Sequence, residues 1–201
     1  LDEWYMYVYD ISNLTKPSYV TEIVTNTVAE TLFLYEGNLF MGTQTGMKVF
    51  SLSNPSSPQF ISEFQHIQSC DPVVVLEDYA YVTLRSGSAC GGFSDQLDVV
   101  DISDITAPFL VKSYEMTNPH GLGIQTDKTL FICDGEAGLK VYDASDPLKI
   151  AENMLYHFPE INAFDVIPLG ELIMMIGADG LYQYTFEEGV MTQISFVPIG
   201  E

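Results

Sequence analysis

The chain has 201 residues, 47% of them hydrophobic, including 12 Tyr and 12 Phe, so it can bury a sizeable core. Its 28 acidic residues outweigh 7 basic ones, which gives a formal net charge of −21. This balance argues against nucleic acid and anionic membrane surfaces as partners, because both need clustered Lys and Arg, and it permits a cation or a basic partner.

The chain opens on LDEWYMYVYD, without an initiator Met and already inside a strand-like pattern, so we expect it to be part of a longer protein. Two strands are predicted within residues 1–24. Four more follow in TLFLY, LFMGTQ, MKVFSL and QFISEF, separated by short turns that are rich in Gly, Asn, Ser and Pro. No apolar run reaches the roughly 18 residues of a membrane-spanning helix.

One position recurs along the chain, at the end of the third strand of each group. The residues at this position are Asp10, Ser51, Asp101, Asp143 and Thr185, at intervals of 41, 50, 42 and 42. The long interval contains a Gly- and Ser-rich insert, RSGSACGGFSD (85–95). A fixed period of this length in β-rich sequence is typical of a β-propeller, in which each repeat folds as one blade of four antiparallel strands.

This period predicts an all-β fold, a single propeller domain with about four and a half blades. The predicted blades are a partial one at 1–24 and complete ones at 27–66, 70–116, 119–158 and 162–199. The partial blade lacks two inner strands, which leaves it open to self-association. The blade number of the intact protein and the way in which the partial blade is completed stay open.

Two further patterns keep the same period. Gly46, Gly138 and Gly180 precede the third strand, where we expect tight turns that need a positive φ. The Asp or Ser after that strand is predicted to accept hydrogen bonds from backbone N–H groups two or three residues on, rather than to bind metal. A Pro then leads into the outer strand, at Pro17, Pro58, Pro108 and Pro147.

LDVVDISD, followed by Pro108, resembles the LVIVD repeat, a β-propeller unit of bacterial and archaeal surface or secreted proteins. KVYDASDP (140–147) is a second close copy. The resemblance implies a propeller in an extracytoplasmic protein: periplasmic, secreted or an outer-membrane lipoprotein. It implies no established activity and no catalytic residues.

Antiparallel strands place the connections between strands 2 and 3, and those between strand 4 and the next strand 1, on one face of the ring. We call it the top face, and the opposite one the bottom face. Polar residues gather on the top face, around the mouth of the central channel, where propellers often bind ligands. The candidate binding residues are Cys70, Asp71, His120, Asn162, Asp165, Asp134 and Glu136.

His120 stands out among these candidates because Pro119 and Gly121 flank it. It either contacts a ligand or forms a hydrogen bond to a neighbouring blade. No second His shares its register, so we expect no three-His metal site, and a divalent cation held by His and carboxylates stays open. We expect no bound cofactor. Cys70 and Cys90 both lie on the top face and are either disulfide-bonded or free. Cys133 is predicted to be a small buried hydrophobe.

The sequence contains no motif for a nucleophile elbow, a zinc protease or a phosphate loop. We therefore expect a non-enzymatic binding or scaffold propeller that holds a protein or glycan on its top face. A carboxylate- or metal-dependent hydrolase or lyase, with its site at the channel mouth, is the alternative. A purely structural repeat within a larger adhesin is a third reading.

Overall fold

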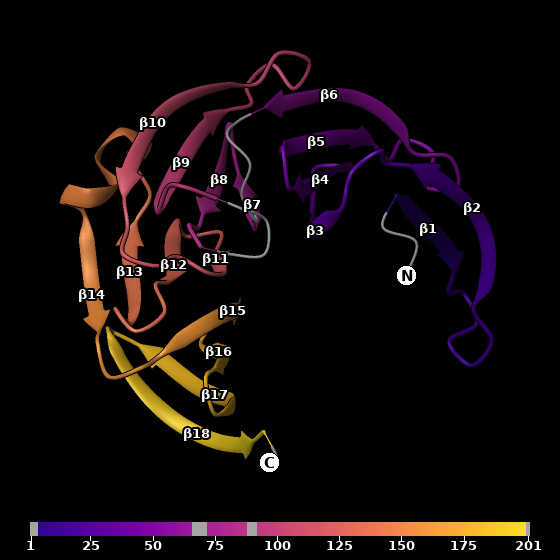
Figure 1. The fold of residues 1–201 in the computed structure, drawn as a ribbon. Coiled ribbons are helices and arrows are strands. Elements are labelled where there is room, and N and C mark those ends of the chain that lie inside the picture. The colour runs from indigo at the N-terminus through magenta and orange to yellow at the C-terminus, as the bar shows by residue number, and fades with distance from the viewer. Residues whose placement is uncertain (1–3, 66–71, 88–91, 200–201) are drawn as a thin grey trace.

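The structure is a computed structural model that describes residues 4–65, 72–87 and 92–199. The described chain is nearly all β, with four antiparallel sheets of four strands arranged in an open ring (Figure 1). This arrangement confirms the predicted propeller fold. No helix in the described residues is long and apolar enough to cross a membrane.

The four sheets form blades that we name A to D in chain order. Blade A consists of β3 (Ala29–Tyr35), β4 (Asn38–Thr43), β5 (Gly46–Ser51) and β6 (Gln59–Gln65). Blade B consists of β7 (Val73–Leu76), β8 (Tyr79–Leu84), β9 (Gln96–Asp101) and β10 (Phe109–Glu115). Blade C consists of β11 (Leu122–Ile124), β12 (Thr129–Cys133), β13 (Leu139–Asp143) and β14 (Met154–Phe158). Blade D consists of β15 (Ala163–Leu169), β16 (Leu172–Gly177), β17 (Gly180–Glu187) and β18 (Val190–Pro198).

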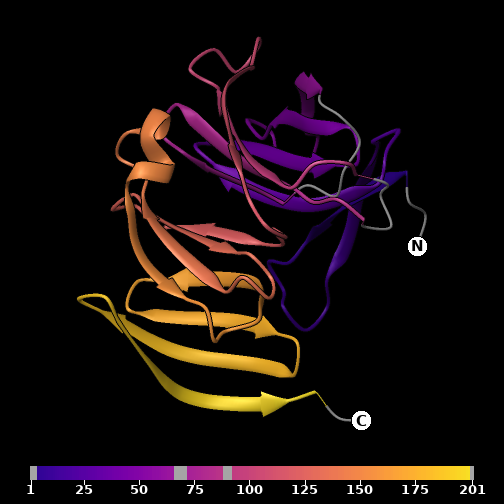
Figure 2. The same cartoon turned by 60° about the vertical axis from the view of Figure 1, so that its left-hand side comes forward.

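A two-stranded sheet precedes blade A, as the sequence predicts. We call it the half-blade; it consists of β1 (Tyr5–Asp10) and β2 (Ser18–Val24). The half-blade and blade D stand at the two ends of the arc, and the ring is open between them (Figure 1). In Figure 2, blade C lies against one side of blade D, and no described blade lies against its other side.

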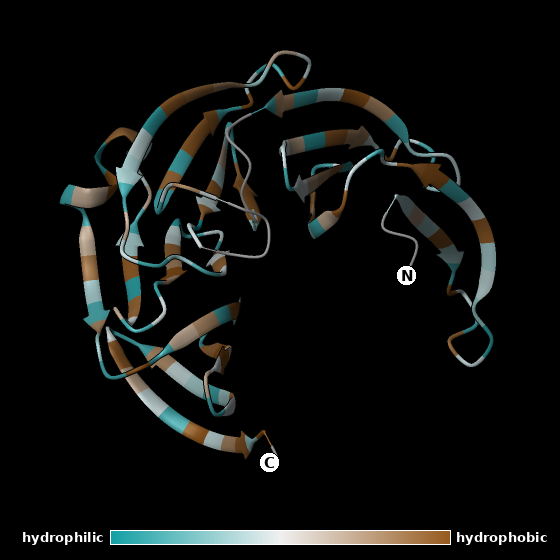
Figure 3. Ribbon diagram, in the orientation of Figure 1, coloured by the Kyte–Doolittle hydropathy of each residue, from teal (hydrophilic) through white to brown (hydrophobic). Residues whose placement is uncertain are grey.

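The core lies between the blades. Phe40 of blade A packs with Val75 of blade B, and Tyr81 of blade B packs with Leu130 of blade C, all at most 2% exposed. A third cluster joins blades C and D. Hydrophobic and hydrophilic residues alternate along outer strands such as β6 and β18 (Figure 3). Successive side chains of a strand point to opposite faces, and this alternation lets each sheet cover its neighbour.

The Asp-rich connections between the third and fourth strands are turns, as predicted. Asp10, Asp101 and Asp143 each accept a hydrogen bond from the N–H two residues on, at 2.8 to 2.9 Å. Ser51 does the same in blade A through its hydroxyl oxygen, at 3.3 Å. Hydrogen bonds from the N–H and hydroxyl of Ser12 lower the pKa of the Asp10 carboxyl, and those from the hydroxyl and N–H of Ser145 lower that of Asp143, because they favour the charged form.

Blade C departs from this pattern. The prediction that Pro147 leads directly into an outer strand is wrong. Pro147 begins a short 3₁₀ helix, η1 (Pro147–Glu152). Asp146 caps this helix by accepting from the N–H of Leu148, and Ile150 is fully buried. The cause is length: β13 ends at Asp143 and β14 begins at Met154, which leaves three more residues here than in blades A and B.

The positive φ predicted for the glycines ahead of the third strands is confirmed at two of the three, and all three share a further cause. Gly46 and Gly138 have positive φ angles of +145° and +93°, whereas Gly180 does not. In all three, an added Cβ would meet a carbonyl oxygen of the fourth strand, 1.9 Å from Phe64 and 2.3 Å from Val197 in blades A and D. Glycine is therefore required at this position by the close approach of the outer strand.

Candidate functional site

A pocket of about 300 Å³ lies on the top face at the mouth of the channel. Every complete blade contributes to its lining. The lining residues that carry charges or rings are Glu30 of blade A, Arg85 after β8, His120 before β11, and Phe164 and Asp165 at the start of β15. The pocket is thus a property of the ring and not of one blade.

His120 is held by three blades. Its N–H donates to the carbonyl of Cys133 at 2.7 Å within blade C, and its carbonyl accepts from the Thr83 hydroxyl of blade B at 2.7 Å. Its ring stacks on Phe164 of blade D, with the ring centroids 4.7 Å apart. The predicted contact with a neighbouring blade is therefore present, and the ring also faces the pocket.

Arg85 approaches the same imidazole. Its Nη1 lies 2.6 Å from Nδ1 and 3.1 Å from Nε2 of His120. A guanidinium only donates, so the histidine nitrogen that it contacts accepts, and the ring is then neutral. Burial and the charge of Arg85 both lower the pKa of His120, which agrees with a neutral ring.

Asp165 lies in the inner strand of blade D and lines the same pocket as Arg85 of blade B. Burial raises the pKa of its carboxyl, and a hydrogen bond from the N–H of Val166 opposes this effect. Part of the side chain remains open to solvent, which limits the consequence for stability. Two groups with pKa values shifted away from their ordinary range thus line one pocket, which is common at functional sites.

The PHG sequence allows a close approach at this point. The N–H of Gly121 donates to the Phe164 carbonyl at 2.7 Å. A Cβ on Gly121 would lie 2.1 Å from Oδ1 of Asp165. Only glycine therefore lets blades C and D meet here with His120 and Asp165 on the same pocket.

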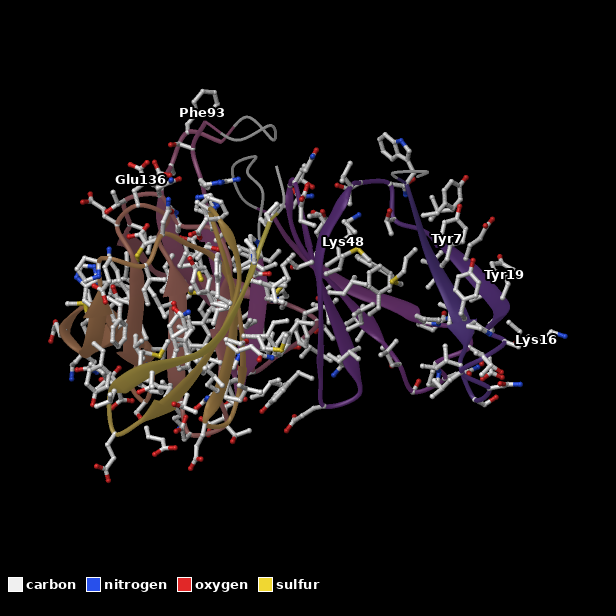
Figure 4. All side chains as sticks on the ribbon, turned by 90° about the horizontal axis from the view of Figure 1, so that it is seen from below. Tyr7, Lys16, Tyr19, Lys48, Phe93 and Glu136 are labelled. Atoms are coloured by element: carbon white, nitrogen blue, oxygen red, sulfur yellow. The ribbon has the colours of Figure 1, made fainter. Side chains whose placement is uncertain are left out.

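Asp134 does not line the pocket. Its side chain is fully buried and accepts from the N–H groups of Thr117 and Asn118, at 3.1 and 2.6 Å. It also forms an ion pair with Lys140. These bonds anchor the connection between blades B and C, which also carries His120. Glu136, two residues on, is exposed on the top face (Figure 4).

Asn162 lies in a separate hollow of about 490 Å³ that Asp179 and Tyr182 also line. Its Oδ1 is buried without a hydrogen-bond partner among the described residues. The Tyr182 hydroxyl donates to Asp179 at 2.6 Å and raises its own pKa to about 12 in doing so. Asn162 thus shares the top face with His120 but not its pocket.

Three predicted residues, Cys70, Asp71 and Cys90, lie outside the described residues, so their placement and the predicted disulfide stay predictions. Cys133 is fully buried and unbonded, as predicted, and burial raises its pKa.

The charged or aromatic pocket residues that the sequence does not predict are Glu30, Arg85 and Phe164. Arg85 lies in the predicted insert 85–95 and is the one arginine in the whole chain. That scarcity was a usable signal, because a lone guanidinium in a chain of net charge −21 has many competing carboxylates. Phe164 gave no signal, since strand aromatics are usually core.

The bottom face carries a larger hollow, of about 740 Å³, with Asp127, Glu171 and Glu187 on its lining. Among the described residues, no group of three or more His, Cys, Asp or Glu is arranged to hold a metal ion.

Three solved structures share this fold. A functionally unknown protein from Desulfotomaculum acetoxidans DSM 771 is similar over 98% of this chain and 64% of its own, with a TM-score of 0.76 and 10% identity. A protein from Lactobacillus plantarum is similar over 96% and 62%, with a TM-score of 0.72 and 14% identity. AztD from Citrobacter koseri is similar over 88% and 49%, with a TM-score of 0.60 and 12% identity.

At these identities the similarity shows the fold alone, and the chain spans less than two thirds of the length of each of these structures. No curated protein matches the sequence. The LVIVD repeat family matches residues 69–116, the segment that includes blade B and its LDVVDISD strand. The chain is therefore a β-propeller that contains the LVIVD repeat.

Proposed function

We propose that this propeller is a non-enzymatic binding module that holds a partner on its top face, with a glycan as the partner that suits the pocket best. The observation that carries the proposal is the pocket to which all four complete blades contribute. It combines a guanidinium donor, the carboxylate acceptors of Glu30 and Asp165, and the rings of His120 and Phe164. Sugar hydroxyl groups both donate and accept, so they match such a mixed lining.

Phe93 adds support from the rim of the same face. It projects from the connection between β8 and β9, and 88% of its surface is exposed (Figure 4). An exposed aromatic ring is costly to leave in water and offers a flat surface for stacking. It would contact either a sugar ring or an apolar side chain of a protein, which keeps a protein as the alternative partner.

The test is binding of the 201-residue chain to an array of immobilised oligosaccharides that includes neutral, amino and uronic acid sugars. We expect Arg85→Gln to weaken binding to any hit by about tenfold or more, since a charge-assisted hydrogen bond contributes about 1.5–3 kcal/mol. Phe93→Ala should also weaken it, because it removes the exposed ring on which a sugar would stack. Lys112→Gln, on the outer strand of blade B, is the matched control and leaves binding unchanged. If both variants bind a hit as tightly as the unmodified chain does, the proposed site is contradicted.

A second function, hydrolysis or lyase chemistry at the same pocket, is favoured by one observation: the pKa of Asp165 is raised and that of His120 is lowered. The contact of Arg85 with the imidazole opposes it, because it occupies the nitrogen that a general base would use. Release of reducing ends from bound oligosaccharides, lost in Asp165→Asn, would favour this function over simple binding.

We also propose an extracytoplasmic location, which rests on the resemblance to LVIVD surface proteins. An oxidising compartment favours a disulfide between Cys70 and Cys90. Mass mapping of unreduced peptides from the exported protein tests this pairing. Both thiols found free and alkylated would contradict it.

A further inference from the structure

The two ends of the arc expose sheet faces of the kind that are buried inside it. On blade D, the side facing the opening carries Ile167, Ile176 and Val197, which are 55%, 45% and 58% exposed. Ile167, Ile176 and Leu181 also line an apolar pocket of about 200 Å³. This face is larger and more contiguous than scattered surface hydrophobes.

The register identifies this face as a blade-packing face. In blade A, Phe33 pairs with Phe40 across β3 and β4, and Met47 pairs with Phe64 across β5 and β6. These side chains belong to the cluster that blade B covers. The same strand positions in blade D hold two pairs, Ile167 with Met174 and Leu181 with Val197. Blade D thus repeats the apolar pattern of blade A without a described blade against it.

The half-blade presents the other side of the opening. Met6 and Ile23 face blade A and pack against its core cluster. The alternate residues Tyr5, Tyr7 and Tyr9 face away from it and are 36%, 45% and 53% exposed. Figure 4 shows Tyr7 and Tyr19 at this end of the molecule.

The half-blade is also short of strands. Its β1 holds the place of a third strand, because the Asx turn and outer strand follow it as they follow β5. In blade A the third strand pairs with β4 on its inner side. Among the described strands, β1 pairs only with β2. Its inner edge therefore has room for two strands, and an open edge of this length invites pairing.

We propose that these two faces dock further blades of the same repeat, and that the last of these blades adds its first two strands to β1 and closes the ring. The lengths agree. The chain corresponds to 64% of the similar Desulfotomaculum structure. The remaining third of such a structure is about 100 residues, or about two and a half repeats of 42 residues. This would bring the ring to about seven blades, within the four to eight that are typical.

A second copy of this chain satisfies these surfaces less well. A copy would bring its own half-blade, which lacks the same two strands, so neither β1 would gain the inner pair that complete blades have. Edge-to-edge pairing of two β1 strands would cover the edge alone and leave the face around Ile176 exposed.

The test is an extended chain: residues 1–201, followed by second copies of 119–201 and then of 27–43. The added segments supply two blades and a β3–β4 pair, with connections as long as the native ones. We expect a monomer in which the amides of Tyr5 and Tyr9, which alternate with the residues bonded to β2 and so point to the open inner edge, exchange with deuterium at least 100-fold more slowly than in the 201-residue chain. The matched control ends before the second copy of 27–43, and its β1 amides should exchange as fast as in the 201-residue chain.

The substitution Ile176→Lys adds a second readout. It should lower the thermal midpoint of the extended chain while leaving that of the 201-residue chain within a degree or two. Equal exchange at β1 in the extended chain and its control would overturn the proposal. So would a defined dimer of the 201-residue chain, seen by sedimentation, with protected β1 amides, because a second copy would then be the occupant. Sedimentation of the 201-residue chain shows whether a second copy is the occupant even if the extended chain does not fold.

Discussion

On the bottom face, Asp10, Asp101 and Asp143 occupy the same position in their sheets and accept the same hydrogen bond from two residues on. On the top face, the equivalent residues at the start of each first strand differ: by register, Glu30 of blade A, His120 of blade C and Phe164 of blade D occupy the same position, and the predicted equivalence of His120 with Asn162 is wrong. A polar residue that recurs in the half-blade and in blades A to C serves a need that these repeats share. A polar residue that occurs once, held in place by neighbouring blades, is a better candidate for function.

Asp134 is the sharpest exception to this comparison, because it is a unique top-face residue that serves the fold. We expect Asp134→Ala to lower the free energy of unfolding by about 3–5 kcal/mol, since it leaves the Lys140 ammonium and two N–H groups without their partner. Denaturant unfolding measures the loss. Glu136→Ala, exposed two residues away, should change it by less than about 0.5 kcal/mol. Equal effects would mean that Asp134 is not the anchor.

Substitutions in the bottom-face turns should lower the free energy of unfolding by less, and Ser51 of blade A shows which replacement the turn accepts. Asp101→Ala removes the acceptor for the N–H and hydroxyl of Ser103 and should cost about 1 kcal/mol. Asp101→Ser should restore most of this, because Ser51 fulfils the same role in blade A. If Ser restores nothing, the carboxylate at this position does more than close a turn.

His120 gives the smallest of these effects, as a dependence on pH. Because the pKa of the folded imidazole lies below that of the unfolded one, about 6.5, the unfolded chain binds the proton more readily. The contribution of His120 is complete above pH 6.5 and is lost as the pH falls below it. Unfolding curves between pH 7.5 and 5 should show this decline, and the decline should be shallower in His120→Gln. An identical slope in the variant would show that other groups cause it.

The sequence was sufficient for the fold because its landmarks repeat. The spacing of Asp101, Asp143 and Thr185, together with the apolar strands before them, predicts the blades without any tertiary knowledge. The predicted strand end at Thr185 is wrong, because β17 continues to Glu187 and a two-residue turn replaces the Asp-rich one. The 3₁₀ helix at Pro147 was missed because its cause is loop length, and Pro begins a helix as readily as it precedes an outer strand.

The site was predictable only in part. The topology placed His120 and Asp165 at one end of the ring, and the structure brings both to one pocket. The sequence does not distinguish Asp134 from these two residues, because it does not show which carboxylate at a strand end turns inward to accept from backbone N–H groups. Arg85 follows a buried strand by one residue, and its contact with a ring two connections away depends on how blades B and C pack.

The most direct test of the account is a comparison of Arg85→Gln with Asp101→Ala in both thermal unfolding and oligosaccharide binding. The account predicts that Arg85→Gln loses binding by about tenfold or more with little change in thermal midpoint, whereas Asp101→Ala lowers the midpoint and binds like the unmodified chain. If both variants bind a ligand equally well, the top-face pocket is not the site and the contrast between the two faces loses its functional meaning.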